Sequence, residues 1–88
     1  MKIHQKIEAN GAKSPISPAN GTTYTLKEVQ EHVGGLVELV RLPGGKNIML
    51  VDEEGLLKKN PVYNEQASAL ARRPIVGTAI VIPSSSFK

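Results

Sequence analysis

The sequence predicts a small α+β domain in which an antiparallel or mixed sheet carries two short helices. Short apolar runs, separated by Gly, Pro, Asn and Ser, are typical of strands. Two other segments place apolar residues at helical spacing behind a capping residue. The expected order is β-α-β-β-α-β, which a ferredoxin-like split βαβ unit also has. A looser sheet with its helices on one face is an equal alternative.

The first expected strand covers residues 2–9, where Ile3 and Ile7 lie among polar residues. Its weak pattern indicates an edge position. Residues 10–24 follow as a long loop, because they contain two Asn-Gly and two Ser-Pro pairs and no apolar period. Loops of this length inside compact domains are either functional or linkers.

The segment TLKEVQEHV, residues 25–33, has the clearest helical pattern. Thr25 is expected to cap its N-terminus, and Glu28 completes a capping box. The expected buried face consists of three apolar residues at positions i, i+3 and i+7: Leu26, Val29 and Val33. The glycine pair at 34–35 is expected to end the helix, because glycine accepts a positive φ without a Cβ penalty.

The segment LVELVRL, residues 36–42, is the next expected strand. It carries apolar residues on both faces, which favours a central strand or one covered on both sides. Glu38 and Arg41 interrupt it, either as outward positions or as the lining of a pocket at a subunit interface. Lys46 after Gly44-Gly45 resembles a fragment of a phosphate loop. Because Ser or Thr and a helix do not follow, we expect a plain hairpin to the strand at 47–52.

The second half of the chain predicts one more helix and one more strand. The helix covers residues 64–71, with Asn64 as its cap. Its expected buried residues are Ala67, Leu70 and Ala71. The almost wholly apolar segment 74–82 is the last strand and is expected to be central, with Gly77 marking a bulge or a close contact. We therefore expect one domain over residues 1–83 and a flexible tail over 84–88.

Composition excludes several classes of function. The 11 Lys and Arg residues against 8 Asp and Glu give a net charge of +3 with interleaved signs. This argues against a DNA-binding protein with a concentrated basic face and against an acidic DNA mimic, so nucleic acid is not an expected partner. The absence of cysteine excludes disulfides and thiolate chemistry. No secretory signal or membrane-length apolar run appears, so we expect a cytoplasmic protein.

The sequence does not predict an enzyme. Asp52, Glu53 and Glu54 are consecutive, so their side chains diverge, and we expect a solvated turn and no metal site. His4 and His32 lie far apart, and no nucleophile–base pair or glycine-rich cofactor loop is evident. No cofactor is expected. With only three aromatic residues, the core is small, which favours a homo-oligomer.

The candidate ligand-binding residues flank the second helix. They are positive, aromatic or amide side chains: Arg72, Arg73, Lys58, Lys59, Tyr63 and Asn64, with Arg41 from the preceding strand. Arginine binds phosphate through its planar fork, and tyrosine can stack on a base. The alternative is that the arginine pair only caps a helix end and the lysine pair only keeps a loop soluble. Cations at helix ends are common.

Residues 20–83 resemble an uncharacterised family, domain of unknown function 3846. The resemblance rests on NGTTYTLKEVQEHVGGLVELVRL, IMLVDEEGLLKKNPVYNEQASALA and RPIVGTAIVI. Members of this family occur in phages, plasmids and bacterial genomes, so the resemblance implies a mobile-element accessory protein, and it transfers no catalytic residue. We expect a non-enzymatic protein that sequesters an anionic nucleotide-type immune signal to suppress host defence. The alternative is an anti-restriction or regulatory module that contacts a host protein or DNA.

Overall fold

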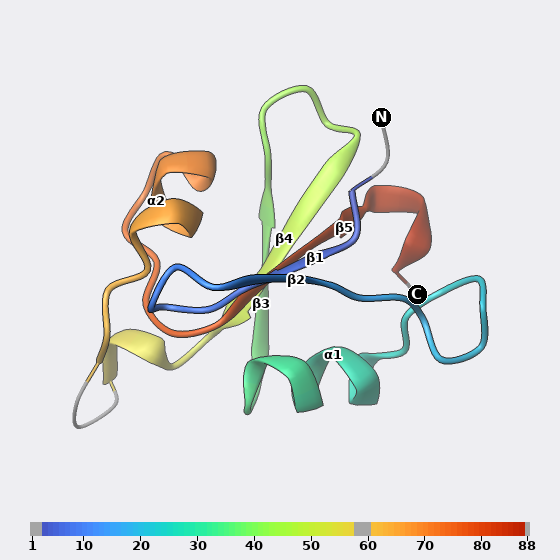
Figure 1. The fold of residues 1–88 in the computed structure, drawn as a ribbon, viewed down its shortest axis with the longest axis horizontal. Helices are drawn as coiled ribbons and strands as arrows, with labels where there is room; N and C mark the ends of the chain where they lie inside the picture. The colour runs from blue at the N-terminus through green and yellow to red at the C-terminus, as the bar shows by residue number, and fades with distance from the viewer. Residues whose placement is uncertain (1–2, 58–60, 88) are drawn as a thin grey trace.

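The computed structural model describes residues 3–57 and 61–87, which form one five-stranded sheet with a helix on each face (Figure 1). The strands are β1 (Gln5–Ile7), β2 (Lys13–Pro15), β3 (Val37–Arg41), β4 (Asn47–Asp52) and β5 (Ala79–Pro83). The helices are α1 (Leu26–Val33) and α2 (Glu65–Ala71), with 3-10 turns η1 (Gly55–Leu57) and η2 (Ser84–Ser86). The predicted α+β class is confirmed.

The sheet order is β2-β1-β5-β4-β3, and every neighbouring pair is antiparallel. In a split βαβ unit the two strands joined by a helix run parallel, with another strand between them. The pairings here make β1 and β3, the strands expected before and after α1, run in opposite directions, so the ferredoxin-like alternative is wrong. Because successive side chains of a strand point to opposite faces, the core has two halves. On one face Ile48, Leu50 and Ile80 pack with Val29 of α1. On the other face Met49, Val51 and Val81 pack with Ala67 of α2, so the alternative with both helices on one face is also wrong.

The edge position expected for the first strand is wrong. The segment 10–24, expected as a loop, contains β2, which pairs with β1 and moves β1 to an inner position. β3, expected to be central or covered on both sides, is an edge strand that pairs with β4 alone, so the second alternative is confirmed. Its two apolar faces reflect a helix above and a helix below the sheet. They do not require a neighbouring strand on each side.

The capping box that begins α1 is confirmed. The Glu28 N–H donates to Thr25 Oγ1 at 3.2 Å, and the Thr25 N–H donates to Glu28 Oε1 at 3.4 Å. Gly34 ends the helix in the left-handed region with φ 92°, and its N–H donates to the Gln30 carbonyl. Val29 and Val33 are buried as expected, but Leu26 is 50% exposed, because it lies in the first turn outside the contact with the sheet.

The predicted cap of α2 is also confirmed. Asn64 Oδ1 accepts the Ala67 N–H at 3.0 Å. Ala67 is buried, whereas Leu70 points outward and is 45% exposed. Ser68 takes the inner position, and its hydroxyl exchanges hydrogen bonds with the backbone N–H and carbonyl of Ile75. A hydroxyl satisfied in this way is compatible with burial. The predicted buried face is therefore wrong at Leu70 alone, since Ala71 is half-buried and packs against the core.

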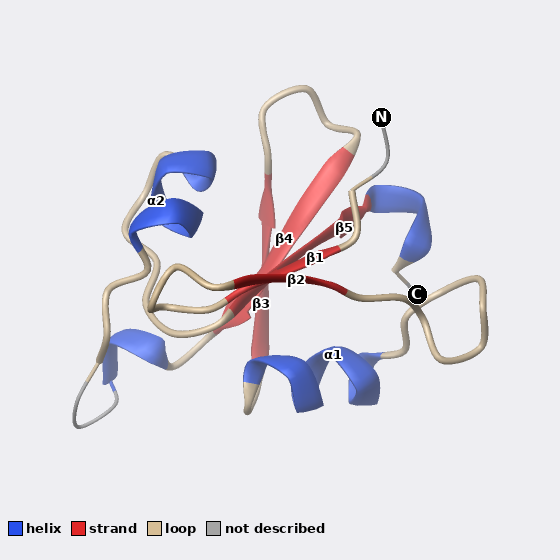
Figure 2. Cartoon of the chain, in the orientation of Figure 1, coloured by secondary structure: helices blue, strands red, loops and turns tan. Residues whose placement is uncertain are grey.

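The remaining segments follow the prediction except at the C-terminus. Gly44 and Gly45 have φ 93° and 73° in the hairpin between β3 and β4. The strand β5 is central, between β1 and β4. Within the segment 84–88, expected as a flexible tail, residues 84–86 instead form η2, the short helical turn that follows β5 (Figure 2). The Ser86 carbonyl accepts the Tyr24 N–H at 2.6 Å, and Phe87 packs against the core on the α1 face.

Candidate functional site

The candidate ligand-binding residues chosen from the sequence lie at the two ends of α2 and on one edge of the sheet. Lys58 and Lys59 lie outside the described residues. Tyr63 precedes the N-terminus of α2, and the arginine pair 72–73 follows its C-terminus. Arg41 lies at the end of the edge strand β3. The seven residues of α2 span about 10 Å at 1.5 Å per residue, so the helix separates Tyr63 from the arginine pair.

Arg73 is held by a carboxylate. Its guanidinium donates to Glu38 Oε2 at 3.2 Å, and both side chains are about half exposed. The hollow beside it has a volume of about 50 Å³ and also contains Asp52 and Glu53 on its wall. Three carboxylates around one guanidinium disfavour a phosphate, because like charges repel in a shared site.

Asn64 has a structural role. The side chain is fully buried, and its amide donates to the Ile7 carbonyl at 3.0 Å and to the Gly77 carbonyl at 2.8 Å. Its oxygen accepts the N–H of Ala67. Both amide hydrogens are thus committed to the fold, and Asn64 joins α2 to β1 and to the segment before β5.

The two other candidate residues that flank α2, Arg72 and Tyr63, are exposed, but the fold does not bring them together. Arg72 caps α2 in the left-handed region, with φ 58°, and its N–H donates to the Ser68 carbonyl. Tyr63 is 56% exposed and forms an isolated bridge with Val76. The hollow beside Arg73 is not lined by Tyr63. The geometry therefore does not support one phosphate-and-base site around α2.

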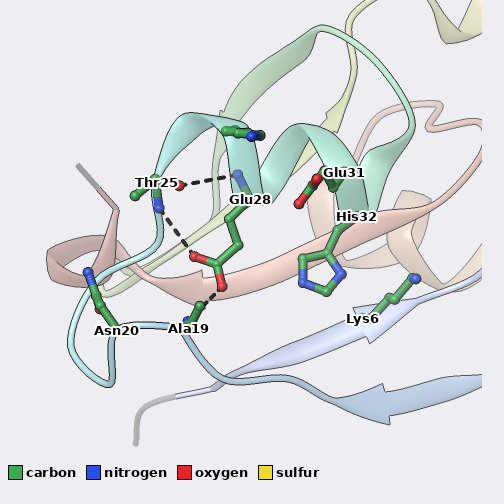
Figure 3. Close-up of a pocket in the computed structure, with 8 residues that line it drawn as sticks. Lys6, Ala19, Asn20, Thr25, Glu28, Glu31 and His32 are labelled. Carbon is green, nitrogen blue, oxygen red and sulfur yellow. Dashed lines mark hydrogen bonds between the residues drawn. The ribbon is translucent and has the colours of Figure 1, made fainter.

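A larger hollow lies on the other side of the sheet, between α1, β1 and the loop before α1 (Figure 3). It is an open groove with a volume of about 550 Å³. Most of its lining side chains are polar or charged: Lys6, Ala19, Asn20, Thr25, Lys27, Glu28, Glu31 and His32. Ligand sites usually have volumes of ~300–1,000 Å³, so the groove is large enough for a small molecule.

Glu28 builds the wall of this groove. One carboxylate oxygen accepts the Ala19 N–H at 2.7 Å, and the other accepts the Thr25 N–H. These bonds, drawn in Figure 3, fasten the loop to the first turn of α1. Beyond them, the Asn20 side chain accepts the backbone N–H groups of Thr22 and Thr23, both at 2.9 Å. The loop is therefore an ordered rim.

Besides Glu28, four ionisable side chains line the groove: Lys6, Lys27, Glu31 and His32. Figure 3 shows the imidazole of His32 directed from α1 towards β1, where Lys6 lies, with Glu31 next to His32 on the helix. Lys6 and His32 are half-buried, and Glu31 is exposed. Positive groups and carboxylates from α1 and β1 thus line the same groove.

Reasoning from the sequence missed this groove. His32 lies near the C-terminal end of α1, where a favourable interaction with the helix dipole is enough to explain a histidine, and Lys6 is one polar residue of a weak strand. The helix places Lys27, Glu28, Glu31 and His32 on one side of α1, at i, i+1, i+4 and i+5, which any amphipathic helix does. Only the strand pairing of β1 places Lys6 opposite them.

An aromatic pair with one fully buried member lies near the rim. The Tyr24 hydroxyl is 2.8 Å from His4 Nδ1, and the Tyr24 side chain is fully buried. Burial raises the pKa of the Tyr24 phenol, and the charge of Glu28 raises it further. The uncharged phenol therefore holds His4, which precedes β1, to the loop before α1 through this hydrogen bond.

Comparison with known proteins identifies a family and nothing more specific. A family model described as "Domain of unknown function (DUF3846)" matches residues 7–86. No curated protein and no solved structure matches the chain. Within the part of the chain that the structure describes, no helix is long and apolar enough to cross a bilayer.

Proposed function

The chain belongs to the DUF3846 family, and from that premise we propose that it is a non-enzymatic module that binds an anionic, nucleotide-type ligand in the groove beside α1. The observation that carries the proposal is the groove of about 550 Å³, which Lys6 of β1 and His32 of α1 both line. A mononucleotide or a cyclic dinucleotide fits the usual volume range of such sites.

The mixture of charges favours a nucleotide over a simple anion. The Lys6 ammonium and an imidazole N–H of His32 supply donors for phosphate oxygens, and hydrogen bonds to a charged phosphate are among the stronger ones in proteins. Glu31 would repel a bare phosphate, but its carboxylate can accept a hydrogen bond from a ribose hydroxyl or an exocyclic amine. A ligand that offers both acceptors and donors uses all three side chains.

The groove is better suited to holding a ligand than to converting one. The Thr25 hydroxyl accepts the Glu28 N–H as the helix cap, and Glu28 is bonded to two backbone N–H groups. Neither is positioned as a nucleophile or a free base. The corresponding biological role is sequestration, in which the protein withholds a nucleotide immune signal of the host from its receptor.

The test is a panel of mono-, di- and cyclic nucleotides at millimolar concentration, read by thermal shift and followed by calorimetry with the best ligand. Lys6→Ala and His32→Ala should each weaken binding roughly tenfold to a hundredfold, because a charge-assisted bond contributes ~1.5–3 kcal/mol. Lys13→Ala is the matched control, since this exposed lysine of β2 does not line the groove.

A second control separates the groove from the site nominated at α2. Arg73→Ala should leave the affinity unchanged, because Arg73 pairs with Glu38 at a distance from the groove lining. If Arg73→Ala abolishes binding while Lys6→Ala does not, the ligand lies at the end of α2 and the groove assignment is wrong. If no nucleotide shifts the melting temperature, the proposed ligand class is wrong, and the alternative of a protein- or DNA-contacting module takes its place.

A further inference from the structure

The two edges of the sheet differ in what they offer to another strand. The β2 edge has three residues, all exposed, and ends in Pro15, which has no N–H. Short strands, lysines and prolines are devices that protect an edge from pairing. The β3 edge has five residues, and the large apolar side chains of Leu36 and Leu39 are 54% and 40% exposed there. The open edge of this sheet is therefore β3.

The ladder shows which backbone groups of β3 point away from the sheet. The Glu53 N–H donates to the Leu36 carbonyl at 2.9 Å, and this pair continues the register in which Val37 faces Asp52. In an antiparallel ladder, hydrogen-bonded pairs alternate with non-bonded ones. Because Leu36 is in a bonded pair, the even-numbered residues that follow it in β3 also bond to β4. The backbone N–H and carbonyl groups of the odd-numbered residues, Val37, Leu39 and Arg41, therefore point away from β4, towards the open edge.

We propose that this edge pairs with β3 of a second copy of the chain, antiparallel, across a two-fold axis at Leu39. Leu39 then faces the partner's Leu39, and Val37 faces the partner's Arg41. Each outward residue exchanges both of its backbone hydrogen bonds with its partner residue. The two sheets become one continuous sheet, with a closed and isologous interface.

Other registers that the symmetry permits are less favourable. An axis at Glu38 or at Arg41 would set like charges directly opposite each other, which is destabilising. An axis at Val40 would set Val37 opposite the partner's Pro43, which has no N–H to donate. The axis at Leu39 avoids both problems, and it sets Glu38 opposite the partner's Val40 while Glu38 keeps its own ion pair with Arg73.

The side chains near the axis also favour pairing between copies. The two Leu39 side chains would lie on the face of the sheet that α1 covers. Val37, two residues earlier in β3 and therefore on the same face, packs into that half of the core. Each covers exposed apolar surface of the other. The groove is lined by Lys6 of β1, and β5 and β4 lie between β1 and the β3 edge in the sheet. Association through β3 therefore leaves the groove open.

Light scattering behind a sizing column tests the association, from about 1 to 500 μM protein. The unmodified chain should approach twice its own mass of 9.4 kDa. Leu39→Lys should shift the protein to the mass of one chain, because two ammonium groups would meet at the axis. Leu70→Lys, at an exposed leucine of α2, is the matched control and should stay associated. A wild type at 9.4 kDa throughout, or equal behaviour of the two variants, would overturn the proposal.

Cross-linking tests the register and does not depend on the affinity. Because the chain has no cysteine, single cysteines report one contact each. Under mild oxidation, Leu39→Cys chains should form covalent dimers, since facing residues of a ladder lie within disulfide range. Leu70→Cys chains, with circular dichroism as a check on folding, should not. The axis at Leu39 would be refuted if Leu39→Cys chains cross-linked to Arg41→Cys chains but did not cross-link to other Leu39→Cys chains.

Discussion

Replacing Asn64 by alanine tests whether this side chain belongs to the fold or to a ligand site. It was a candidate ligand-binding residue in the sequence, but it is fully buried and makes three hydrogen bonds, to Ala67, Ile7 and Gly77. The loss of a helix N-cap costs about 1 kcal/mol. Leaving a buried carbonyl without its donor costs about 1–3 kcal/mol. With two carbonyls affected, one of them only part-buried, we expect Asn64→Ala to lower the free energy of unfolding by about 3–4 kcal/mol.

That loss is a large part of the total stability. A domain of this length has about 4–13 kcal/mol at ~0.05–0.15 kcal/mol per residue. With an m value near 1 kcal/mol/M, the urea midpoint should fall by about 3–4 M. Asn64→Asp keeps the cap acceptor but sets a carboxylate oxygen against the two carbonyls, so it should cost at least as much as Asn64→Ala.

The assay is urea unfolding followed by circular dichroism, with m values compared between variants. Asn10→Ala is the control, because the exposed Asn10 side chain accepts one N–H, from Ala12 at 2.9 Å, and water can replace that bond. It should cost less than about 1 kcal/mol. If Asn64→Ala costs no more than Asn10→Ala, the buried network does not stabilise the fold and this reasoning fails.

Two further predictions concern α1 and the buried tyrosine. Gly34→Ala should lower the free energy of unfolding by about 1 kcal/mol, because φ is 92° at this residue. Gly35→Ala should be nearly neutral, since the added Cβ would meet only Asp52 Oδ1 at 4.0 Å. Equal losses of stability for the two variants in urea unfolding would contradict this reasoning. Burial raises the pKa of Tyr24, so its contribution to stability is complete below about pH 10, the unfolded value, and is lost as the pH rises through the folded value. At pH 8, Tyr24→Phe should be about 1 kcal/mol less stable than the wild type, through loss of the hydrogen bond to His4. Above pH 10 this difference in the free energy of unfolding should become smaller, because the wild type loses stability when Tyr24 ionises. A constant difference from pH 8 to 11 would argue against a raised pKa of Tyr24.

Local chemistry made the helices and the hairpin predictable. The Thr25 and Glu28 capping box, the Asn64 cap and the glycine pair at 44–45 each depend on contacts within a few residues, and each is present. The apolar segment that became β5 was long enough to indicate a central strand. Such features need no knowledge of what packs against them.

The neighbours of each strand were not predictable in the same way. Apolar residues on both faces of β3 did not distinguish a central strand from one covered on both sides, and the structure has a covered edge strand. The three-residue strand β2 exists because β1 provides a ladder, and its own residues, Lys13 to Pro15, have no strand pattern. Leu70 and Ser68 exchanged their expected positions because the Ile75 backbone satisfies the hydroxyl.

The candidate site depended on the same long-range information. The residues around α2 were adjacent in sequence, but one is buried, one is ion-paired and two lie outside the described residues. The groove residues come from β1, the loop and α1, which are separated in sequence and meet only through the sheet. Proximity in sequence is therefore a weak guide to a site in this small fold.

The position of β5 has a consequence for folding of the domain. β5 follows the other four strands in sequence, yet it lies between β1 and β4 and joins the β1–β2 hairpin to the β3–β4 hairpin. Until β5 pairs, each hairpin has an inner edge without a partner, and the apolar residues of β4 are uncovered on that side. The pairing of β5 with β1 brings together residues as distant in sequence as Ile7 and Ala79. Such long-range pairing is slow, because the entropy of closing the intervening chain is lost before the contacts form. We therefore expect docking of β5 between the two hairpins to be the slow step of folding.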